Sequence, residues 1–344
     1  MQIITVRNEE AGQRLNKFLG KYLSGATVSF IYKMLRKKNI VLNGKKADGL
    51  ERLNANDEIK LFLSDETIAK FTGSLKGAAS GTKGISFPAE FTGITVVYED
   101  SNIILFNKPA GILSQKACKT DVSMVEYLLS YLTETGFIKQ GEPRGFQPGI
   151  CNRLDRNTSG LLIAGKTLAG SQVMSELIKE RRVRKFYRCI VKGVIASEQT
   201  VDGYLIKNEK NNTVKVAETA AGNEGWLPVR TRYIPICNNG SETFLEVELI
   251  TGRTHQIRAH LASIGHPIAG DSKYGSESFN KRFKCECGLD SQLLHAYRLE
   301  FPAEAQNNIQ EKVLSDLFGK SILAPLPQRF EKILSMCKLN GQAW

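Results

Sequence analysis

The segment Asn152-Arg153-Leu154-Asp155-Arg156-Asn157-Thr158-Ser159-Gly160 decides how this sequence is interpreted. It places one carboxylate between two arginines and among small hydroxyl side chains. The apolar run Leu161-Leu162-Ile163-Ala164 follows at once and predicts a buried strand. A salt-bridged turn would also explain the segment taken alone, since structural ion pairs are common. We interpret it as a polar loop at the edge of a buried strand, with Asp155 as a candidate catalytic carboxylate.

The same run overlaps a nucleotide-binding pattern. Residues 160–167, Gly-Leu-Leu-Ile-Ala-Gly-Lys-Thr, match the P-loop spelling. A P-loop follows a buried strand and presents backbone N–H groups to phosphates. Here the four residues between the glycines are strongly apolar, so they are expected to be the strand itself. We therefore predict no nucleotide cofactor; ATP-dependent turnover lost on Lys166→Ala would support the rejected interpretation.

A second segment gives the carboxylate a partner. Residues 251–261, Thr-Gly-Arg-Thr-His-Gln-Ile-Arg-Ala-His-Leu, lie where a strand is expected to pass into a helix. If Arg258 meets Asp155 inside a pocket, its charge keeps the carboxylate ionised despite partial burial. An ionised, desolvated carboxylate with no second acid nearby is suited to nucleophilic attack.

Composition narrows the class of protein. The chain has 344 residues, which suggests about two domains, and its 47 Lys and Arg against 35 Asp and Glu give a net charge of +12. This excess favours a polyanionic partner, either nucleic acid or an anionic membrane surface. No apolar run approaches the ~20 residues needed to span a bilayer, and the first ten residues do not resemble a secretion signal. Seven thinly spread cysteines do not indicate a disulfide framework. We expect a cytoplasmic protein with no membrane partner.

No metal site is expected. Cys285, Cys287 and His295 supply at most three ligands and lack the usual CxxC spacing, so thiols in a surface loop are the simpler interpretation. His255 and His260 are five residues apart and do not share one helix face as metalloprotease ligands do.

Residues 1–64 read as a compact basic unit. One helical stripe begins at Leu15, and a second helix, with Ser29 as a plausible cap, precedes a hairpin turn at Asn43-Gly44. Residues 57–63 read as a closing strand. Basic side chains occupy the other faces, and a solvated surface would explain them equally well. Close in sequence, they can also form one phosphate-binding patch, for which the candidates are Arg14, Lys17, Lys33, Arg36, Lys37 and Lys45.

The rest of the chain divides into a linker and a larger domain. Glycines and serines between residues 73 and 84 predict a flexible linker, placed at 65–93. From residue 94 to 344 we expect one domain with a core to about residue 302 and a helical tail. Many strands and few helices predict a mixed, largely antiparallel α+β fold. The predicted strands lie at 95–98, 103–106, 161–164, 187–191 and 243–250, and the helices at 171–179 and 255–264.

Both units resemble known families. The first is similar to the S4 RNA-binding domain, a small α/β unit, through residues 12–19 and 41–45. The second resembles RluA-type pseudouridine synthases, in which an S4 domain usually precedes the catalytic domain. The segments that carry this resemblance are 96–100, 107–111, 152–160, 185–193, 252–258, 265–271 and 294–296.

This resemblance implies roles for individual residues. Asp155 would be the nucleophile, paired with Arg258, and Tyr187 would stack on the base and help to remove the C5 proton. Leu294 would pack against a flipped nucleotide, and Arg153 would fill the gap left in the RNA stack. The substrate-binding set is Arg153, Leu294, Asn152 and Thr158. The implied reaction isomerises uridine in structured RNA, most naturally 23S ribosomal RNA, and needs neither metal nor cofactor.

Two positions depart from the family pattern. Asn152 stands where the family usually has His. Gln115 stands where, in the family, a His often follows a Gly-Leu-Leu segment. Because Asn still donates and accepts hydrogen bonds, we expect altered loop geometry and not lost activity. The alternative is a catalytically silent RNA-binding or ribosome-assembly factor on the same fold, against which the filled Asp155, Tyr187 and Arg258 positions speak. We expect a monomer.

Overall fold

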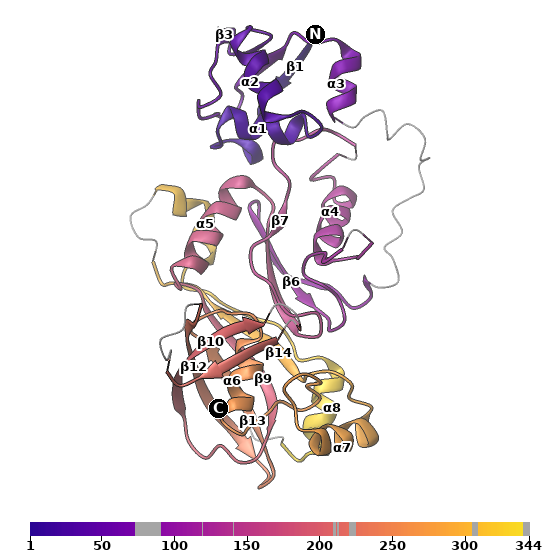
Figure 1. Cartoon of the computed structure of the whole chain (residues 1–344), viewed down its shortest axis with the longest axis vertical. Helices are drawn as coiled ribbons and strands as arrows, with labels where there is room; N and C mark the ends of the chain where they lie inside the picture. Colours follow the sequence, from indigo (N-terminus) through magenta and orange to yellow (C-terminus); the bar gives the residue numbers. More distant parts are fainter. Residues whose placement is uncertain are drawn as a thin grey trace.

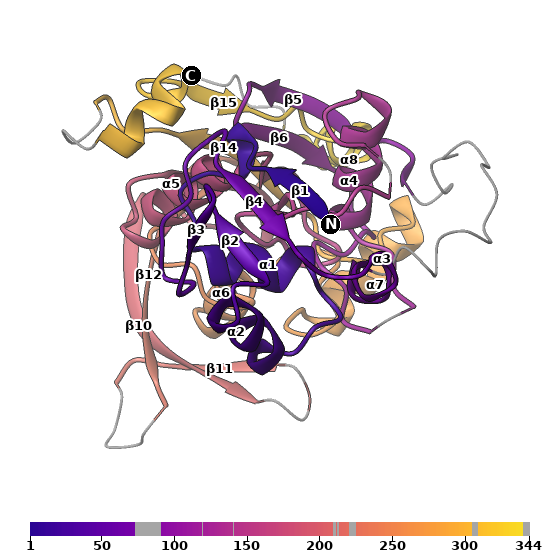
Figure 2. The same ribbon diagram turned by 90° about the horizontal axis from the view of Figure 1, so that it is seen from above.

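The computed structural model describes residues 1–72, 91–118, 120–139, 141–208, 211, 213–219, 225–304 and 309–339. A small N-terminal unit lies at one end of the molecule, and a larger sheet domain makes up the rest (Figure 1). Seen from above, the small unit covers one end of the larger domain (Figure 2).

The N-terminal unit packs helices against a four-stranded sheet. Its strand order is β1-β4-β2-β3. The predicted turn is confirmed, since Asn43 and Gly44 adopt left-handed φ angles of 50° and 73°. The predicted cap is wrong: Thr27 Oγ1 accepts from the Phe30 N–H at 3.2 Å, and Ser29 lies in the first turn. The elements are β1 (Gln2–Thr5), η1 (Asn8–Glu10), α1 (Leu15–Tyr22), α2 (Val28–Arg36), β2 (Ile40–Leu42), β3 (Lys45–Lys46) and β4 (Glu58–Leu61).

At both ends of the predicted linker, residues 65–93, the structure shows residues that belong to the flanking units. Residues 65–72 form helix α3 (Asp65–Thr72), from which Ile68 and Phe71 pack on the N-terminal core. Phe91 is buried in the core of the larger domain. The glycine-rich stretch, residues 73–84, lies outside the described residues. A linker beginning at residue 65 was therefore wrong, because an amphipathic helix closes the first unit.

One twisted sheet organises the larger domain. Its main path among the described residues is β11-β10-β12-β13-β9-β14-β8-β6-β5, and every pairing except β14 with β8 is antiparallel. This confirms the largely antiparallel α+β fold. The strands are β5 (Thr95–Glu99), β6 (Ile103–Lys108), β7 (Gly149–Ile150), β8 (Ser159–Gly165), β9 (Arg184–Lys192), β10 (Gln199–Asn208), β11 (Thr213–Ala217), β12 (Leu227–Asn238), β13 (Glu242–Leu249), β14 (Leu294–Glu300) and β15 (Ser321–Leu323).

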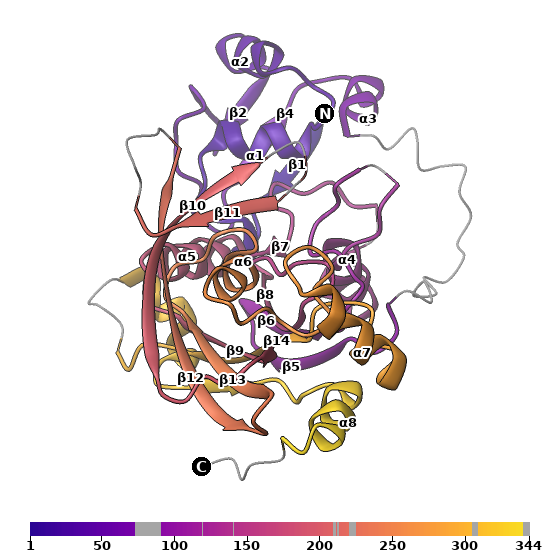
Figure 3. The same ribbon diagram turned by 60° about the horizontal axis from the view of Figure 1, so that its bottom comes forward.

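Helices pack against this sheet. Helix α6 lies beside the β10–β11 hairpin and in front of the central strands (Figure 3). The helices are α4 (Met124–Glu134), α5 (Leu168–Lys179), α6 (Gln256–Ser263), α7 (Glu277–Cys287), the 3-10 segment η4 (Ile309–Leu317) and α8 (Gln328–Met336).

The P-loop-like run is a strand, as predicted. All seven residues of β8 are buried between β6 and β14. Gly160 has a φ of 108°, and a Cβ there would overlap the backbone of Ala296. Lys166 is buried and donates to Glu99 Oε1 at 2.6 Å, so it is committed to an ion pair within the fold.

A short segment ahead of β7 joins the two units. Glu10, almost fully buried, accepts the backbone N–H of Gly145 at 2.7 Å. A Cβ at Gly145 would collide with the ring of Phe18, and Arg144 lies 3.6 Å from Glu9. We call residues 142–146 the docking segment. It couples the N-terminal core directly to the chain that leads into the 152–160 loop.

The cysteines are all free thiols, and Cys285 and Cys287 lie on α7, not in the predicted surface loop. In the part of the chain that the structure describes, no three His, Cys, Asp or Glu side chains gather as metal ligands would. Nor does any helix within those ranges have the length and apolar character to cross a membrane.

Candidate active site

A cavity of about 880 Å³ brings the predicted site residues together. Its lining comes from the 152–158 loop between β7 and β8, from β9, from the start of β14 and from the N-terminal end of α6. The lining includes every residue predicted to act in catalysis or substrate binding, namely Asn152, Arg153, Asp155, Thr158, Tyr187, Arg258 and Leu294.

Arg258 holds the candidate nucleophile. Its Nη1 donates to Asp155 Oδ2 at 2.8 Å, while its Nε and Nη2 donate to the two carboxylate oxygens of Asp271 at 2.7 and 2.9 Å. Asp271 is fully buried, whereas the Asp155 side chain is 26% exposed to the cavity. Burial acts to lower the pKa of Arg258, but the two carboxylates outweigh it and raise the pKa above its usual value. The guanidinium therefore stays charged.

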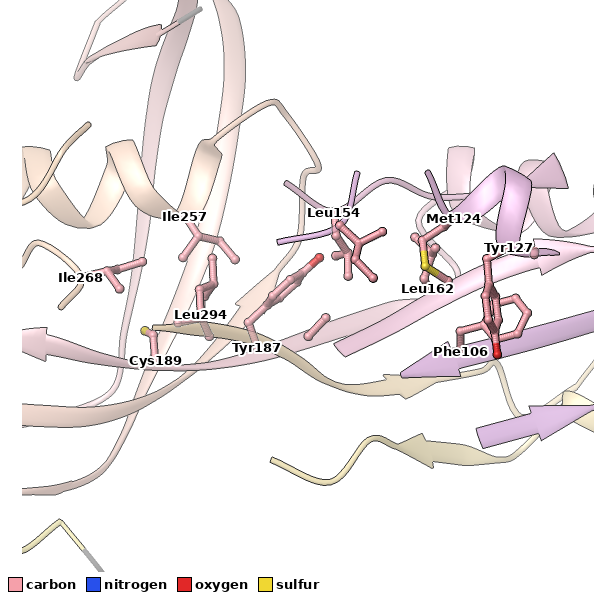
Figure 4. Close-up of a cluster of buried hydrophobic side chains, with 14 of the residues drawn as sticks. Phe106, Met124, Tyr127, Leu154, Leu162, Tyr187, Cys189, Ile257, Ile268 and Leu294 are labelled. Atoms are coloured by element: carbon pink, nitrogen blue, oxygen red, sulfur yellow. The ribbon is translucent and has the colours of Figure 1, made fainter. Parts of the chain in front are cut away.

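Tyr187 and Leu294 form the apolar wall beside the carboxylate. They stand on the adjacent strands β9 and β14, with Leu154 and Ile257 facing them (Figure 4). Both side chains are largely buried. Burial, aided by the charge of Asp155, raises the pKa of Tyr187, so the phenol keeps its proton. A neutral phenol is a weak base, and this geometry favours stacking over proton removal for Tyr187.

Lys108 holds the backbone of the 152–158 loop through hydrogen bonds. This lysine is completely buried, and its Nζ donates to the carbonyl oxygens of Pro109, Ile112 and Arg156 at 2.9, 2.9 and 3.0 Å. Burial lowers its pKa to about 7, while the charge of Asp155 acts in the opposite direction. Three carbonyl acceptors match the three N–H bonds of an ammonium group. Lys108 thus fixes the backbone directly after Asp155.

The remaining predicted residues differ in their contacts. Asn152 bonds to strand β8: its Oδ1 accepts from Ile163 N at 2.7 Å and its Nδ2 donates to Leu161 O at 3.5 Å. Thr158 is buried and its Oγ1 accepts from Gln292 Nε2 at 3.4 Å. Arg153 is exposed at the cavity lining.

The cavity is electropositive. Of the described residues that line it, Asp155 is the only carboxylate, whereas seven basic side chains lie around it: Lys116, Arg153, Arg156, Lys185, Arg253, Arg258 and Lys273. Such a lining attracts a polyanion and leaves a single negative side chain at its centre.

Sequence reasoning gave no role to Lys108 or Asp271, although both lie in segments that carry the family resemblance. Nor did it give roles to His255 and Tyr274, which also line or support the cavity. Lys108 comes two residues after the apolar run 103–106, and a lysine so close to a buried strand is a signal that the sequence offers, since a buried cation needs partners. Asp271 is recognisable only once Arg258 is seen to need a second acceptor.

Comparisons with known proteins agree with this geometry. Residues 102–263 match the family model described as RNA pseudouridylate synthase. A protein of Vibrio parahaemolyticus named ribosomal large subunit pseudouridine synthase C is 29% identical, and the match covers 97% of this chain and 96% of that one. The Escherichia coli protein of the same name is 28% identical over 88% of each chain.

A solved structure shares the fold. Human RNA pseudouridylate synthase domain containing 4 aligns with a TM-score of 0.56 and 22% identity, covering 71% of this chain and 92% of that one. Residues 102–263, which the family model matches, contain the loop of Asp155, the strand of Tyr187 and the helix of Arg258. Over residues 102–263 the chain is similar to the RNA pseudouridylate synthases, and over nearly its full length it is similar to ribosomal large subunit pseudouridine synthases, which supports a synthase of the RluA type.

Proposed function

We propose that this protein isomerises uridine to pseudouridine in structured RNA, with 23S ribosomal RNA as its substrate. The observation that carries the proposal is the carboxylate of Asp155, held by Arg258 beside Tyr187 in an electropositive cavity. The names of the relatives support ribosomal RNA of the large subunit as the substrate.

The reaction exchanges one bond of the nucleoside for another. Asp155 attacks either the anomeric carbon C1′ or the uracil ring, and the N1–C1′ bond breaks. The base then rotates and C5 bonds to C1′; this step displaces the Asp155 carboxylate from C1′, or, if Asp155 added to the ring, the carboxylate is eliminated afterwards. The C5 proton leaves, and N1 regains a proton. Atoms and electrons balance within the nucleoside, so the isomerisation requires no oxidant, reductant or phosphoryl donor.

The surrounding residues prepare this attack. Arg258 donates a charge-assisted hydrogen bond to the carboxylate of Asp155 in a partly buried site. Tyr187 stacks on the base, Leu294 packs against it, and Arg153 enters the gap that the flipped nucleotide leaves in the RNA. Asn152 acts by holding the loop against β8, and the buried Thr158, bonded to Gln292, forms part of the cavity wall.

The N-terminal unit supplies a second contact with RNA, as an S4 domain would. Its six candidate residues are all exposed, and none forms an ion pair with another described residue. Unpaired surface cations are available to neutralise phosphates. This set is Arg14, Lys17, Lys33, Arg36, Lys37 and Lys45.

We also propose that the protein acts as a monomer in the cytoplasm. The seven free thiols support a reducing compartment.

The decisive experiment replaces Asp155 by its isostere. Asp155→Asn should abolish pseudouridine formation, measured as tritium release from [5-³H]uridine-labelled 23S RNA, while RNA affinity changes little. Asp202→Asn, which removes an exposed carboxylate bound to Arg230 on the β10–β12 pair, is the matched control and should remain active. Activity retained by Asp155→Asn would refute the nucleophile. A wild-type protein that binds this RNA without converting it would establish the silent factor instead.

A further inference from the structure

His255 stands in a strained backbone conformation next to the nucleophile. It is the cap residue of α6 and has a φ of 52°, in the left-handed region that few residues other than glycine adopt. Its side chain is only 8% exposed, lines the cavity, and places Nε2 3.9 Å from Asp155 Oδ2. A strained backbone conformation persists only where the surrounding contacts hold it in place, and such positions cluster at functional sites.

The contacts of Tyr274 favour one tautomer of the His255 imidazole. The Tyr274 hydroxyl oxygen accepts the backbone N–H of Val214, on β11, at 2.8 Å. Its own hydrogen is then available to His255 Nδ1, 3.0 Å away. An imidazole that accepts at Nδ1 carries its proton at Nε2. The Nε2–H group therefore faces Asp155.

The backbone of Tyr274 is held by the same carboxylate that binds Arg258. Asp271 Oδ1 accepts from the backbone N–H of Tyr274 at 3.1 Å, as well as from Arg258 Nη2. The guanidinium of Arg258 lies 5.3 Å from the centre of the Tyr274 ring. His255 and Arg258, one turn apart at the start of α6, are thus held by one buried network.

Arg258 and His255 both direct an N–H group at the same carboxylate oxygen of Asp155. Arg258 Nη1 and His255 Nε2 each face Oδ2 of Asp155, at 2.8 and 3.9 Å. Within the described ranges, Oδ1 accepts no hydrogen bond from another side chain. Burial lowers the pKa of His255 although Asp155 opposes this, so the imidazole is a neutral donor near pH 7.

We infer that His255 and Tyr274 form a positioning pair, which presents an Nε2–H donor to Oδ2 of Asp155 and leaves Oδ1 as the attacking oxygen. This inference rests on the proposed function. Because Tyr274 is bound by β11, the pair also ties the β10–β11 hairpin to the orientation of the nucleophile.

Two isosteric substitutions of His255 separate this role from a purely structural one. The amide N–H₂ of Gln reaches the place of Nε2, whereas that of Asn reaches only the place of Nδ1. A structural requirement for a left-handed residue predicts the opposite preference, because Asn tolerates this region better than Gln. His255→Gln should keep the single-turnover rate within about threefold of wild type, and His255→Asn should lower it about tenfold or more, with equal RNA affinity.

Tyr274→Phe gives a second readout that does not depend on the backbone at residue 255. Losing the hydroxyl frees the imidazole to place its proton on either nitrogen, so we expect a rate loss of about tenfold with unchanged RNA affinity. Added to His255→Gln, Tyr274→Phe should cost almost nothing more, since an amide N–H₂ is a donor whatever its neighbour does. Near-additive losses would contradict the proposed chain of hydrogen bonds.

The outcomes are distinguishable from failure of the function itself. If wild-type protein makes no pseudouridine, the proposed function fails before the variants are compared. If wild type is active, the inference is overturned by His255→Asn equalling or exceeding His255→Gln in rate, or by Tyr274→Phe matching wild type. Thermal unfolding of each variant shows whether it is folded at the assay temperature.

Discussion

Asp271 grips Arg258 with both carboxylate oxygens, at 2.7 Å from Nε and 2.9 Å from Nη2, and so leaves Nη1 directed at the nucleophile. The guanidinium fork is planar, and two bonds on one edge fix the direction of the third donor. The carboxylate of Asp155 thus receives a donor whose position is set from inside the protein and not by the substrate.

Asp271→Asn should weaken this grip. The amide retains one acceptor but no charge, and it leaves a buried guanidinium only partly compensated, which costs about 3 kcal/mol or more of unfolding free energy. The turnover rate should fall at least about tenfold, because Arg258 is free to rotate away from Asp155. Chemical denaturation and tritium release measure the two effects.

The exposed pair of Asp202 and Arg230 provides the comparison. It has the same two-point geometry, at 2.7 and 2.9 Å, on the solvent-exposed surface of the sheet. Solvent and salt screen such a pair, so Asp202→Asn should change neither stability nor rate measurably. Equal effects of the two substitutions would mean that the buried network does not orient the site.

Lys108→Met tests the support beneath the loop. Methionine fills similar space but leaves three buried carbonyl oxygens without their donor, which should cost about 3 kcal/mol or more of stability. Because one of those carbonyls belongs to Arg156, next to Asp155, turnover should fall even at temperatures where the variant is folded. Activity near that of the wild type in the folded variant would assign Lys108 to stability alone.

Lys166→Met is the matched control for that experiment. Lys166 is also buried, but its partners are Glu99 Oε1 at 2.6 Å and the Asp100 carbonyl at 2.8 Å, at the far end of β8. This substitution should destabilise the fold while leaving the turnover of the folded protein largely intact. It also tests the P-loop interpretation, which would require ATP-dependent turnover that disappears with Lys166.

His295 should make the fold sensitive to acid. Its Nδ1 lies 2.8 Å from Ser159 Oγ and its Nε2 3.3 Å from the Ala324 carbonyl, and burial lowers its pKa from 6.5 to about 4. Between these pH values the unfolded chain binds a proton that the folded chain does not, so stability falls as the pH falls through this window. At pH 5 this residue alone accounts for a loss of about 2 kcal/mol relative to pH 7.

The pH dependence of His295→Gln measures that contribution. Its unfolding free energy should decline by about 2 kcal/mol less than that of the wild type between pH 7 and pH 5. The wild type and the variant should run parallel above pH 7, where the imidazole is neutral in both states. Identical acid slopes would show that His295 does not titrate differently on unfolding.

The basic surface of α2 should govern the salt dependence of RNA binding. Replacing Lys33, Arg36 and Lys37 together by Ala removes up to three phosphate contacts, so the plot of log affinity against log salt should become shallower by about 2–3. Lys60→Ala, in the same unit, removes a cation already 2.9 Å from Glu58 and should alter the slope little. An unchanged slope in the triple variant would remove α2 from the RNA interface.

The sequence predicted those elements whose pattern is local. Strand β8 follows from four consecutive apolar residues, and β13 from the alternation of Glu with apolar side chains. Helix α4 is not among the predicted elements, although Ser123 and Glu126 form a capping box at its start, which is a local signal for a helix N-terminus. Strand β12 was missed because it contains Pro228 and Pro235, which normally disfavour a strand; the register shifts just after Pro235.

Of the contacts within the site, the sequence predicts only the one that charge complementarity suggests. A carboxylate in an odd loop and an arginine far along the chain suggested their contact, which the structure shows at 2.8 Å. The buried partners of that contact depend on three-dimensional packing. Nothing in the local sequence around Asp271 or Tyr274 reveals that one clamps Arg258 and the other favours one tautomer of His255.

The docking segment has a mechanical consequence. Because Glu10 and Phe18 grip Gly145, a polypeptide severed between residues 72 and 91 would still sediment as a single particle. The proposed RNA-binding unit would keep its contact with the segment that leads into the loop of Asp155. The two units would therefore stay in contact through the buried bond of Glu10 to Gly145 and the packing of Phe18 on that glycine.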